Sequence, residues 1–180
     1  MHRKFLQNKL DQYSPIDADE ALALLDMVAF VNQHPDCFDR ELSVGHITGS
    51  AWVVDLDRSH VLLTHHRKLD RWLQLGGHSD GDPNTLEVAL REGREESGIE
   101  EIRPVTEEIF DLDIHRIPAR KNKAEHYHYD VRFLIEADRN TPFVVSEESH
   151  DLAWVPLDKV EKLIDEASIL RMLKKTYEIK

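Results

Sequence analysis

Three glutamates, Glu92, Glu95 and Glu96, lie close together near the middle of the sequence, at positions i, i+3 and i+4. On an α-helix, which advances about 100° per residue, these carboxylates fall on one flank. Like charges at this spacing destabilise a helix by roughly 0.2–0.5 kcal/mol per pair, so the cluster calls for solvent or a bound cation. Mg²⁺ and Mn²⁺ prefer hard oxygen ligands, and Mg²⁺ is usually held by carboxylates, water and phosphate oxygens of a substrate. The cluster therefore predicts either metal-dependent phosphate chemistry or an ordinary solvated acidic face.

A helix over residues 84–98 would position these carboxylates. Asn84 is a favourable N-cap with Glu87 completing a capping box, and Gly98 stands where a left-handed residue ends a helix. One face of this helix carries small and apolar side chains that would pack on a sheet: Leu86, Ala89, Leu90, Gly93 and Ser97. The glycine-rich turn 76–82 leads directly into the helix. A glycine turn followed by a carboxylate-bearing helix favours the metal-site interpretation over the acidic face.

This stretch resembles the Nudix box, G-x5-E-x7-R-E-U-x-E-E-x-G-U, in which U is an apolar residue. The matching positions are Gly77, Arg91, Glu92, Glu95, Glu96, Gly98 and Ile99. Pro83 replaces the first glutamate of the box, which in the family is chiefly a partner of the box arginine, and Gly93 replaces an apolar residue. Glu87 could instead pair with Arg91 at i, i+4. The resemblance implies an α/β fold of the Nudix type, an α/β/α sandwich with a mixed β-sheet.

The resemblance also implies a chemistry, metal-dependent hydrolysis of a diphosphate bond in a nucleoside diphosphate linked to another moiety or in a related small molecule. Mg²⁺ or Mn²⁺ would be bound by Glu92, Glu95 and Glu96 with the carbonyl of Gly77 or its neighbour Gly76. Arg91, Glu92 and Glu95 would take part in catalysis. A glutamate of a late loop, Glu147 or Glu148, would serve as general base or further metal ligand, although both could equally belong to an acidic surface loop.

The residues expected to contact the substrate lie in the glycine turn and in a later strand. His78 and Asp80 belong to the turn. Residues 126–135 alternate in polarity, which places one polar set on a single strand face: His126, His128, Asp130 and Arg132. Histidines at i and i+2 can bind zinc when further ligands converge, but no second ligand pair at typical spacing is evident. We favour an exposed strand face, or a polar face lining a histidine-rich cleft, over a zinc site.

The remaining pattern predicts the elements around these residues. An N-terminal helical extension, residues 1–42, contains helices at 2–13 and 17–33, and the Nudix hydrolase domain would occupy residues 43–180. Within that domain the predicted strands are 46–54, 60–64, 71–75, 102–110, 112–117, 126–135 and 152–157, and the closing helices are 157–166 and 168–177. The extension is expected to pack as a helical hairpin on the domain, with a cover over the active site or a homodimer contact as open alternatives.

Composition limits the partners. The chain has 180 residues, a formal net charge of −12 and one cysteine, Cys37. The negative charge argues against binding of a nucleic acid polymer, and the absence of a long apolar run predicts a cytoplasmic protein without a membrane partner. A small-molecule diphosphate is the expected partner. Two alternatives are a catalytically silent Nudix-fold binding module and an isomerase of allylic diphosphates; Cys37 lies too early for the latter.

Overall fold

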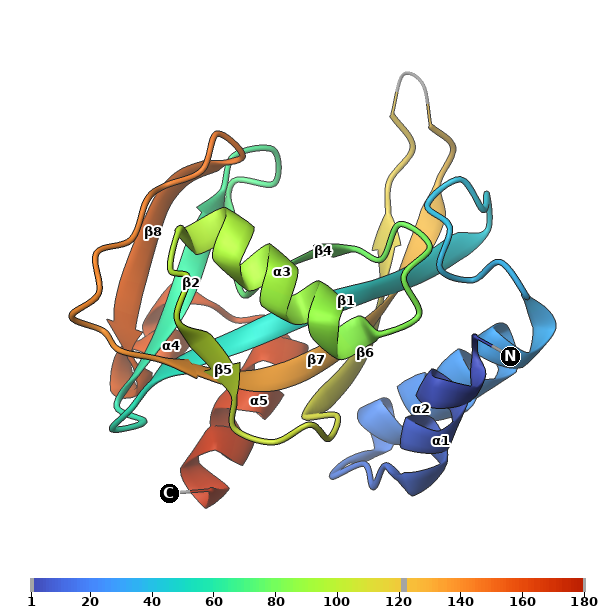
Figure 1. Ribbon diagram of the computed structural model, residues 1–180, viewed down its shortest axis with the longest axis horizontal. Helices are drawn as coiled ribbons and strands as arrows, with labels where there is room; N and C mark the ends of the chain where they lie inside the picture. Colours follow the sequence, from blue (N-terminus) through green and yellow to red (C-terminus); the bar gives the residue numbers. More distant parts are fainter. Residues whose placement is uncertain (1, 121–122, 180) are drawn as a thin grey trace.

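The computed structural model describes residues 2–120 and 123–179, and in it one mixed sheet lies between two layers of helices (Figure 1). The strands are β1 (Gly45–Asp55), β2 (His60–His66), β3 (Arg71–Leu73), β4 (Leu75–His78), β5 (Ile102–Pro104), β6 (Asp111–Ile117), β7 (His126–Ala137) and β8 (Ser149–Pro156). The helices are α1 (Lys4–Gln12), α2 (Ala18–Gln33), α3 (Thr85–Ser97), α4 (Leu157–Leu163) and α5 (Ala167–Glu178). This confirms the predicted α/β/α sandwich with an N-terminal helical extension.

The long central strand β1 organises the sheet. One edge of β1 pairs in parallel with β7 along its whole length, with His46 opposite His128. The other edge is divided: its first half pairs with β4, Thr48 opposite His78, and its second half pairs with β2. Because β2 and β4 leave the same edge of β1 at different points, the sheet opens between them. The turn between β4 and α3 begins after His78, at the end of β4 that lies farther from β2.

Alternate residues of β1 face the two helical layers. A Cβ atom added to Gly49 would collide with Thr85 and Val88 of α3, so the odd-numbered residues of β1 face that helix. On this face one apolar core joins α1, α2 and α3 to the sheet. On the other face a second core forms around Trp52 and packs against α4 and α5. The even-numbered residues of β1, including His46, therefore point away from the box helix.

Helix α3 begins and ends where the sequence predicts, but without the expected hydrogen bond at its N-cap. Gly98 adopts a left-handed conformation, φ 67°, and closes the helix as expected. Asn84 precedes the helix, but its side chain makes no capping hydrogen bond, because Asp82 accepts from the Asn84 main-chain N–H at 2.9 Å and sets a different turn. The replacement at Gly93 has a steric reason, since a Cβ atom there would lie 2.8 Å from Cδ1 of Ile102.

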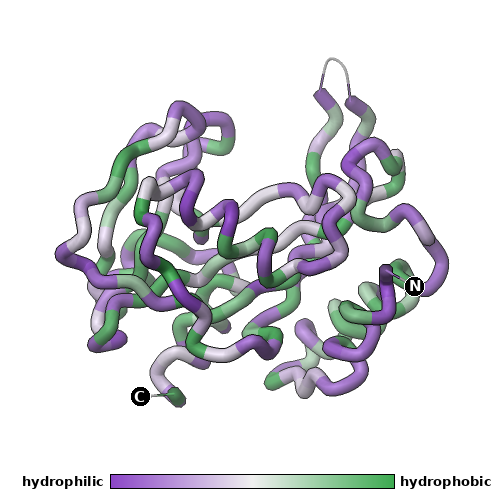
Figure 2. Tube along the Cα trace, in the orientation of Figure 1, coloured by the Kyte–Doolittle hydropathy of each residue, from purple (hydrophilic) through white to green (hydrophobic). Residues whose placement is uncertain are grey.

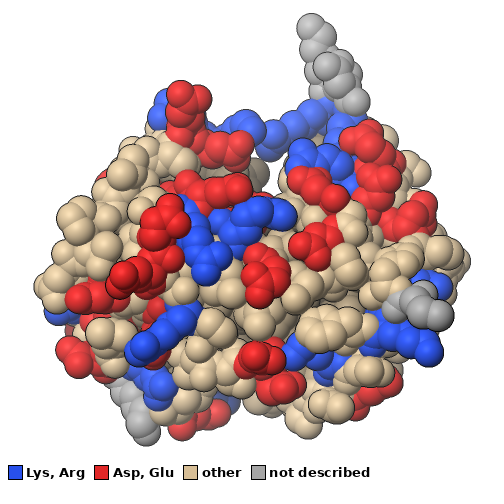
Figure 3. Space-filling model, in the orientation of Figure 1, with Lys and Arg blue, Asp and Glu red and all other residues tan. Residues whose placement is uncertain are grey.

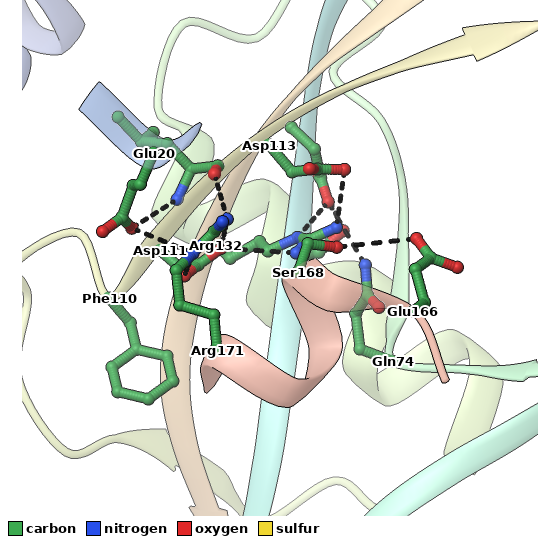
Figure 4. Close-up of polar contacts among 12 residues, drawn as sticks. Glu20, Gln74, Phe110, Asp111, Asp113, Arg132, Glu166, Ser168 and Arg171 are labelled. Carbon is green, nitrogen blue, oxygen red and sulfur yellow. Dashed lines mark hydrogen bonds and ion pairs between the residues drawn. The ribbon is translucent and has the colours of Figure 1, made fainter. Parts of the chain in front are cut away.

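A buried charge network ties the N-terminal helices to the sheet and to the C-terminal helix (Figure 4). Glu20 of α2 is fully buried and accepts hydrogen bonds from Lys175 of α5 and from Tyr13. Lys175 Nζ also donates to Asp111 of β6 at 2.9 Å, and Arg171 donates to Asp111 through two nitrogens at 2.8 and 2.9 Å. Figure 2 shows that apolar residues run along α2.

Several predicted bounds shift at segment ends. The strand expected at 102–110 is shortened to β5, and residues up to Phe110 form a loop whose last amide donates to Arg132 of β7. The predicted strand at 71–75 divides into β3 and β4.

In the part of the chain that the structure describes, no helix is both long and apolar enough to cross a membrane.

Candidate active site

The box arginine and the first box carboxylate are fixed against the glycine turn. Arg91 Nη2 donates to the carbonyl oxygen of His78 at 2.7 Å and to Oε1 of Glu92 at 2.9 Å. The Glu92 carboxylate in turn lies so close to Gly77 that a Cβ atom at that position would overlap it. Burial raises the pKa of Glu92, and the neighbouring Arg91 opposes this rise. Arg91 thus pairs with Glu92 rather than with the expected Glu87, which is exposed.

Glu96 approaches the main chain of the same turn from the following helical turn. Its Oε2 accepts a hydrogen bond from the Gly76 N–H at 3.1 Å. Burial, with repulsion from Glu92 and Glu148, raises the pKa of Glu96 to about 8 against the opposing effect of the Gly76 hydrogen bond. A carboxyl group in this setting is protonated at neutral pH unless a cation offsets the crowding of negative charge.

Glu95 is the exposed member of the cluster. Its side chain is 64% exposed, and Oε1 lies 4.0 Å from Nε of Arg91. On the face of the molecule that carries α3, acidic and basic side chains lie side by side over this helix (Figure 3). The three carboxylates therefore differ in setting: Glu92 and Glu96 touch the glycine turn, whereas Glu95 faces solvent.

The two candidate glutamates of the late loop, Glu147 and Glu148, can be distinguished by their surroundings. Glu148 raises the pKa of Glu96 by charge repulsion, which places its carboxylate within electrostatic reach of the box. The carbonyl of Glu148 also accepts from the Arg67 N–H at 2.9 Å, so the loop is attached to the end of β2. Both side chains are exposed. This geometry favours Glu148 over Glu147 for a role beside the box carboxylates.

A divalent cation fits the donors at the turn. Glu92, Glu95 and Glu96 supply hard carboxylate oxygens on one rigid helix, and the close approach of Glu92 to Gly77 requires a residue without a side chain. Burial, with repulsion from neighbouring carboxylates, raises the pKa of Glu92 and of Glu96, and a bound cation would oppose both effects. Oxygen donors of this kind match Mg²⁺ and Mn²⁺ better than softer metals.

Asp130 and Arg132 lie on the predicted face of β7 but are buried, each 1% exposed. Asp130 accepts from Thr48 and Ser50 at 2.8 and 2.7 Å, and from Arg132 at 2.8 Å. Arg132 also pairs with Asp111 and Asp113 at 3.3 and 3.1 Å. Their hydrogen-bonding groups therefore serve contacts within the sheet.

The turn residue Asp80 is exposed and forms a two-pronged ion pair with Arg40, which follows α2. The hydrogen bond from Arg40 lowers the pKa of Asp80. This pair links the glycine turn to the segment that joins the N-terminal helices to β1.

Three histidines from three strands come together beside the turn. The ligand atoms of His46, His78 and His128 lie within 4.8 Å of one another. Burial, with the charges of His78 and Lys123, lowers the pKa of His46 to about 3; burial and neighbouring histidines lower that of His128 to about 2. The convergence of these three rings was not predicted from the sequence, because it depends on the register of separate strands.

The comparisons with known proteins agree with the fold and the box. The sequence model of the NUDIX domain matches residues 46–175. The asymmetrical bis(5'-nucleosyl)-tetraphosphatase of Mus musculus is 32% identical over 104 residues, which cover 57% of this chain and 67% of the mouse protein. The corresponding protein of Rattus norvegicus is 31% identical over the same shares of the two chains.

Solved structures show the same fold. A C. elegans Ap4A hydrolase binary complex aligns with a TM-score of 0.59 at 20% identity, covering 74% of this chain and 96% of that one. The MutT protein from Methanosarcina mazei Go1 aligns with a TM-score of 0.61 at 17% identity, covering 77% of this chain and 96% of that one.

The chain belongs to the Nudix family. Within that family, whose members act on diphosphate bonds, it is a pyrophosphohydrolase.

Proposed function

We propose that this protein is a Mg²⁺- or Mn²⁺-dependent hydrolase that cleaves a diphosphate bond in a nucleoside diphosphate linked to another moiety. The observation that carries the proposal is the placement of Glu92 and Glu96 against the Gly76–Gly77 main chain, with Glu95 beside them and burial raising the pKa of both inner carboxylates. Dinucleoside tetraphosphates are the first substrates to test, because the mouse and rat relatives carry the name of a tetraphosphatase.

We assign the box carboxylates to metal binding and Arg91 to positioning. Glu92, Glu95 and Glu96, with the carbonyl of Gly77, would hold the cation. When bound, a divalent cation neutralises a diphosphate and lowers the pKa of a coordinated water. Arg91 fixes Glu92 and the His78 carbonyl, and so keeps the turn and helix in register.

The late loop and the glycine turn supply the other groups. Glu148, and less directly Glu147, would accept the proton of the attacking water as general base. Asp80 would contact the substrate from the turn. Asp130 and Arg132 are buried and bonded within the sheet. We therefore propose that they hold the neighbouring polar side chains in position and do not contact the substrate themselves.

Two substitutions test the metal-ligand roles. We expect Glu95→Gln and Glu96→Gln each to lower turnover by about 10²-fold or more, since each removes a charged ligand and a catalytic carboxylate is typically worth about 10²–10⁴-fold. Glu87→Gln is a matched control, because Glu87 is exposed on the same helix. Phosphate release should be measured on dinucleoside polyphosphates, nucleoside diphosphate sugars and oxidised deoxynucleoside triphosphates, with Mg²⁺ and with Mn²⁺. Near-normal rates for both variants would refute the assignment.

The same assay tests the alternative of a silent binding module. No turnover of any substrate, together with no metal binding by calorimetry, would favour that alternative. We also propose that residues 1–42 act as a helical extension of a catalytic domain at residues 43–180. A cytoplasmic location, the absence of a nucleic acid polymer as partner, and a homodimer stay predictions from the sequence.

A further inference from the structure

The three converging histidines lie on the sheet face that points away from the box helix. His46 of β1 and His128 of β7 are directly opposite each other in a parallel pair, so their side chains share a face. Thr48, two residues beyond His46, pairs with His78 of β4, which brings the third ring to the same face. The ring centroids lie 4.7 to 5.1 Å apart. Register between three strands, rather than a local motif, builds this cluster.

The buried rings have unsatisfied nitrogen atoms. His46 is fully buried, and neither of its ring nitrogens has a hydrogen-bond partner among the described residues. Nε2 of His128 is also buried without a partner in the described part of the chain. Buried polar atoms in folded proteins are almost always bonded, and leaving one unpaired costs about 1–3 kcal/mol. One unpaired nitrogen from each ring, with His78 beside them, points to a ligand that the rings share.

The donors select the kind of ligand. Neutral imidazole nitrogens suit zinc and other late transition metals and are poor ligands for Mg²⁺. Three histidines with an open fourth position are a known arrangement for zinc. We propose that His46, His78 and His128 bind a divalent transition-metal ion, with Zn²⁺ as the expected ion, at a second site distinct from the box carboxylates.

The distances are compatible with this ion after a small adjustment. Zinc–nitrogen bonds of about 2.0–2.1 Å in a tetrahedral arrangement place ligand nitrogens about 3.4 Å apart. Here the ligand atoms lie within 4.8 Å of one another. Coordination would require the three nitrogens to move closer together than they lie here, and His78, which is partly exposed, is the ring least enclosed by the fold.

Neighbouring histidines have other partners. Nδ1 of His126 lies 2.9 Å from the carbonyl oxygen of Ala124, and Nδ1 of His115 lies 3.1 Å from Oδ2 of Asp113. These bonds distinguish the two rings from His46, and from Nε2 of His128, for which the described residues supply no partner. His115 stands 5.3 Å from the His128 ring, centroid to centroid, as a polar neighbour.

One contact allows the two metal sites to be separated by substitution. Arg91 of the box bonds to the main-chain oxygen of His78, not to its ring. His78→Ala therefore removes a proposed zinc ligand and keeps the contact that holds the box. Glu96→Gln removes a box carboxylate and keeps all three histidines. The zinc proposal does not rest on the hydrolase proposal, because each site loses its own metal in its own variant.

The test uses the 180-residue chain without a histidine tag. Zn²⁺ binding should be measured by calorimetry, and Co²⁺ binding by its visible absorption, which is intense only in low-coordinate sites. We expect one Zn²⁺ to bind the Glu96→Gln protein. We expect His78→Ala and His128→Gln each to weaken this binding by more than about 100-fold and to abolish the intense Co²⁺ band, because even outer partners of metal ligands are worth about 10–100-fold. His150→Ala, an exposed histidine outside the cluster, is the matched control.

Thermal unfolding gives an independent measurement. Zn²⁺ should raise the unfolding midpoint of the unsubstituted protein and of His150→Ala, since a ligand that binds the folded state stabilises it. The shift should vanish in His78→Ala, whose folding is checked by circular dichroism. Unchanged Zn²⁺ affinity in both histidine variants, or no zinc-dependent shift in the unsubstituted protein, would overturn the proposal.

Discussion

Lys175 is the residue whose removal should most directly test how the N-terminal helices are held. Its side chain is 8% exposed, and its Nζ donates to Tyr13 Oη at 2.8 Å, to the Phe110 carbonyl and Asp111 at 2.9 Å, and to Glu20. These partners come from the segment after α1, from α2 and from β6. A single ammonium group thus links both N-terminal helices, the sheet and α5.

Lys175→Met keeps most of the stem and removes the charge. Breaking a buried ion pair by removing one partner typically costs about 3–5 kcal/mol, because the other charge stays buried. Asp111 keeps its two arginine partners, whereas Glu20 keeps only hydrogen bonds and the Arg171 Nε at 3.7 Å among the described residues. We therefore expect a loss near the lower limit, about 3 kcal/mol of unfolding free energy.

Urea denaturation followed by circular dichroism measures this loss. Lys174→Met, on the exposed side of the same helix, should change the unfolding free energy by less than about 0.5 kcal/mol. Adding Glu20→Gln to Lys175→Met should cost less than the sum of the two single changes, with an interaction energy of about 1–3 kcal/mol. A loss below about 1 kcal/mol for Lys175→Met, or strict additivity, would refute the reasoning.

Two further predictions concern the glycine turn and acid stability. Gly77→Ala should displace the flexible Glu92 carboxylate, because the added Cβ atom would overlap it. We expect Mn²⁺ binding, measured by calorimetry, to weaken by about tenfold or more, while the unfolding free energy changes by less than about 1 kcal/mol. An unaltered Mn²⁺ affinity would contradict this. Burial alone would raise the pKa of Asp113, but Arg132 and His115 outweigh it and lower the pKa to about 2. Because the unfolded value is near 3.9, this carboxylate stabilises the fold by about 2 kcal/mol above pH 4, and the contribution is lost as the pH falls from 4 to 2. Asp113→Asn should thus be less stable at pH 7 in urea titrations and approach the parent protein below pH 3, whereas an equal difference at both pH values would exclude this linkage.

The box helix could be predicted because its determinants are local. The spacing of Glu92, Glu95 and Glu96 and the left-handed Gly98 depend on helical geometry within a few residues. Asn84 is the N-cap residue as predicted, but its side chain forms no capping hydrogen bond, and the side chain of Asp82 accepts the Asn84 amide instead. Competition between neighbouring polar side chains at a turn is decided by the backbone path, which composition does not give.

The β7 face shows what depends on tertiary structure. Alternation placed Asp130 and Arg132 on one face, and the strand has that face. Their burial follows from β6, which brings Asp111 and Asp113 alongside, so charges expected in a cleft compensate one another inside the sheet. A single sequence shows which residues share a strand face, but not which element covers that face.

The histidine site depends on the same kind of information, and β4 shows how closely it adjoins the box. His78 stands at the end of β4: its carbonyl accepts from the box arginine, and its ring joins His46 and His128. Gly77, the preceding residue, lies against Glu92 on the opposite face. Since successive residues of a strand point to opposite faces, the two proposed metal sites lie on either side of a single peptide segment. The carboxylates would hold the hard cation on one side and the imidazoles the softer one on the other, so the ligand chemistry itself keeps each ion at its own site.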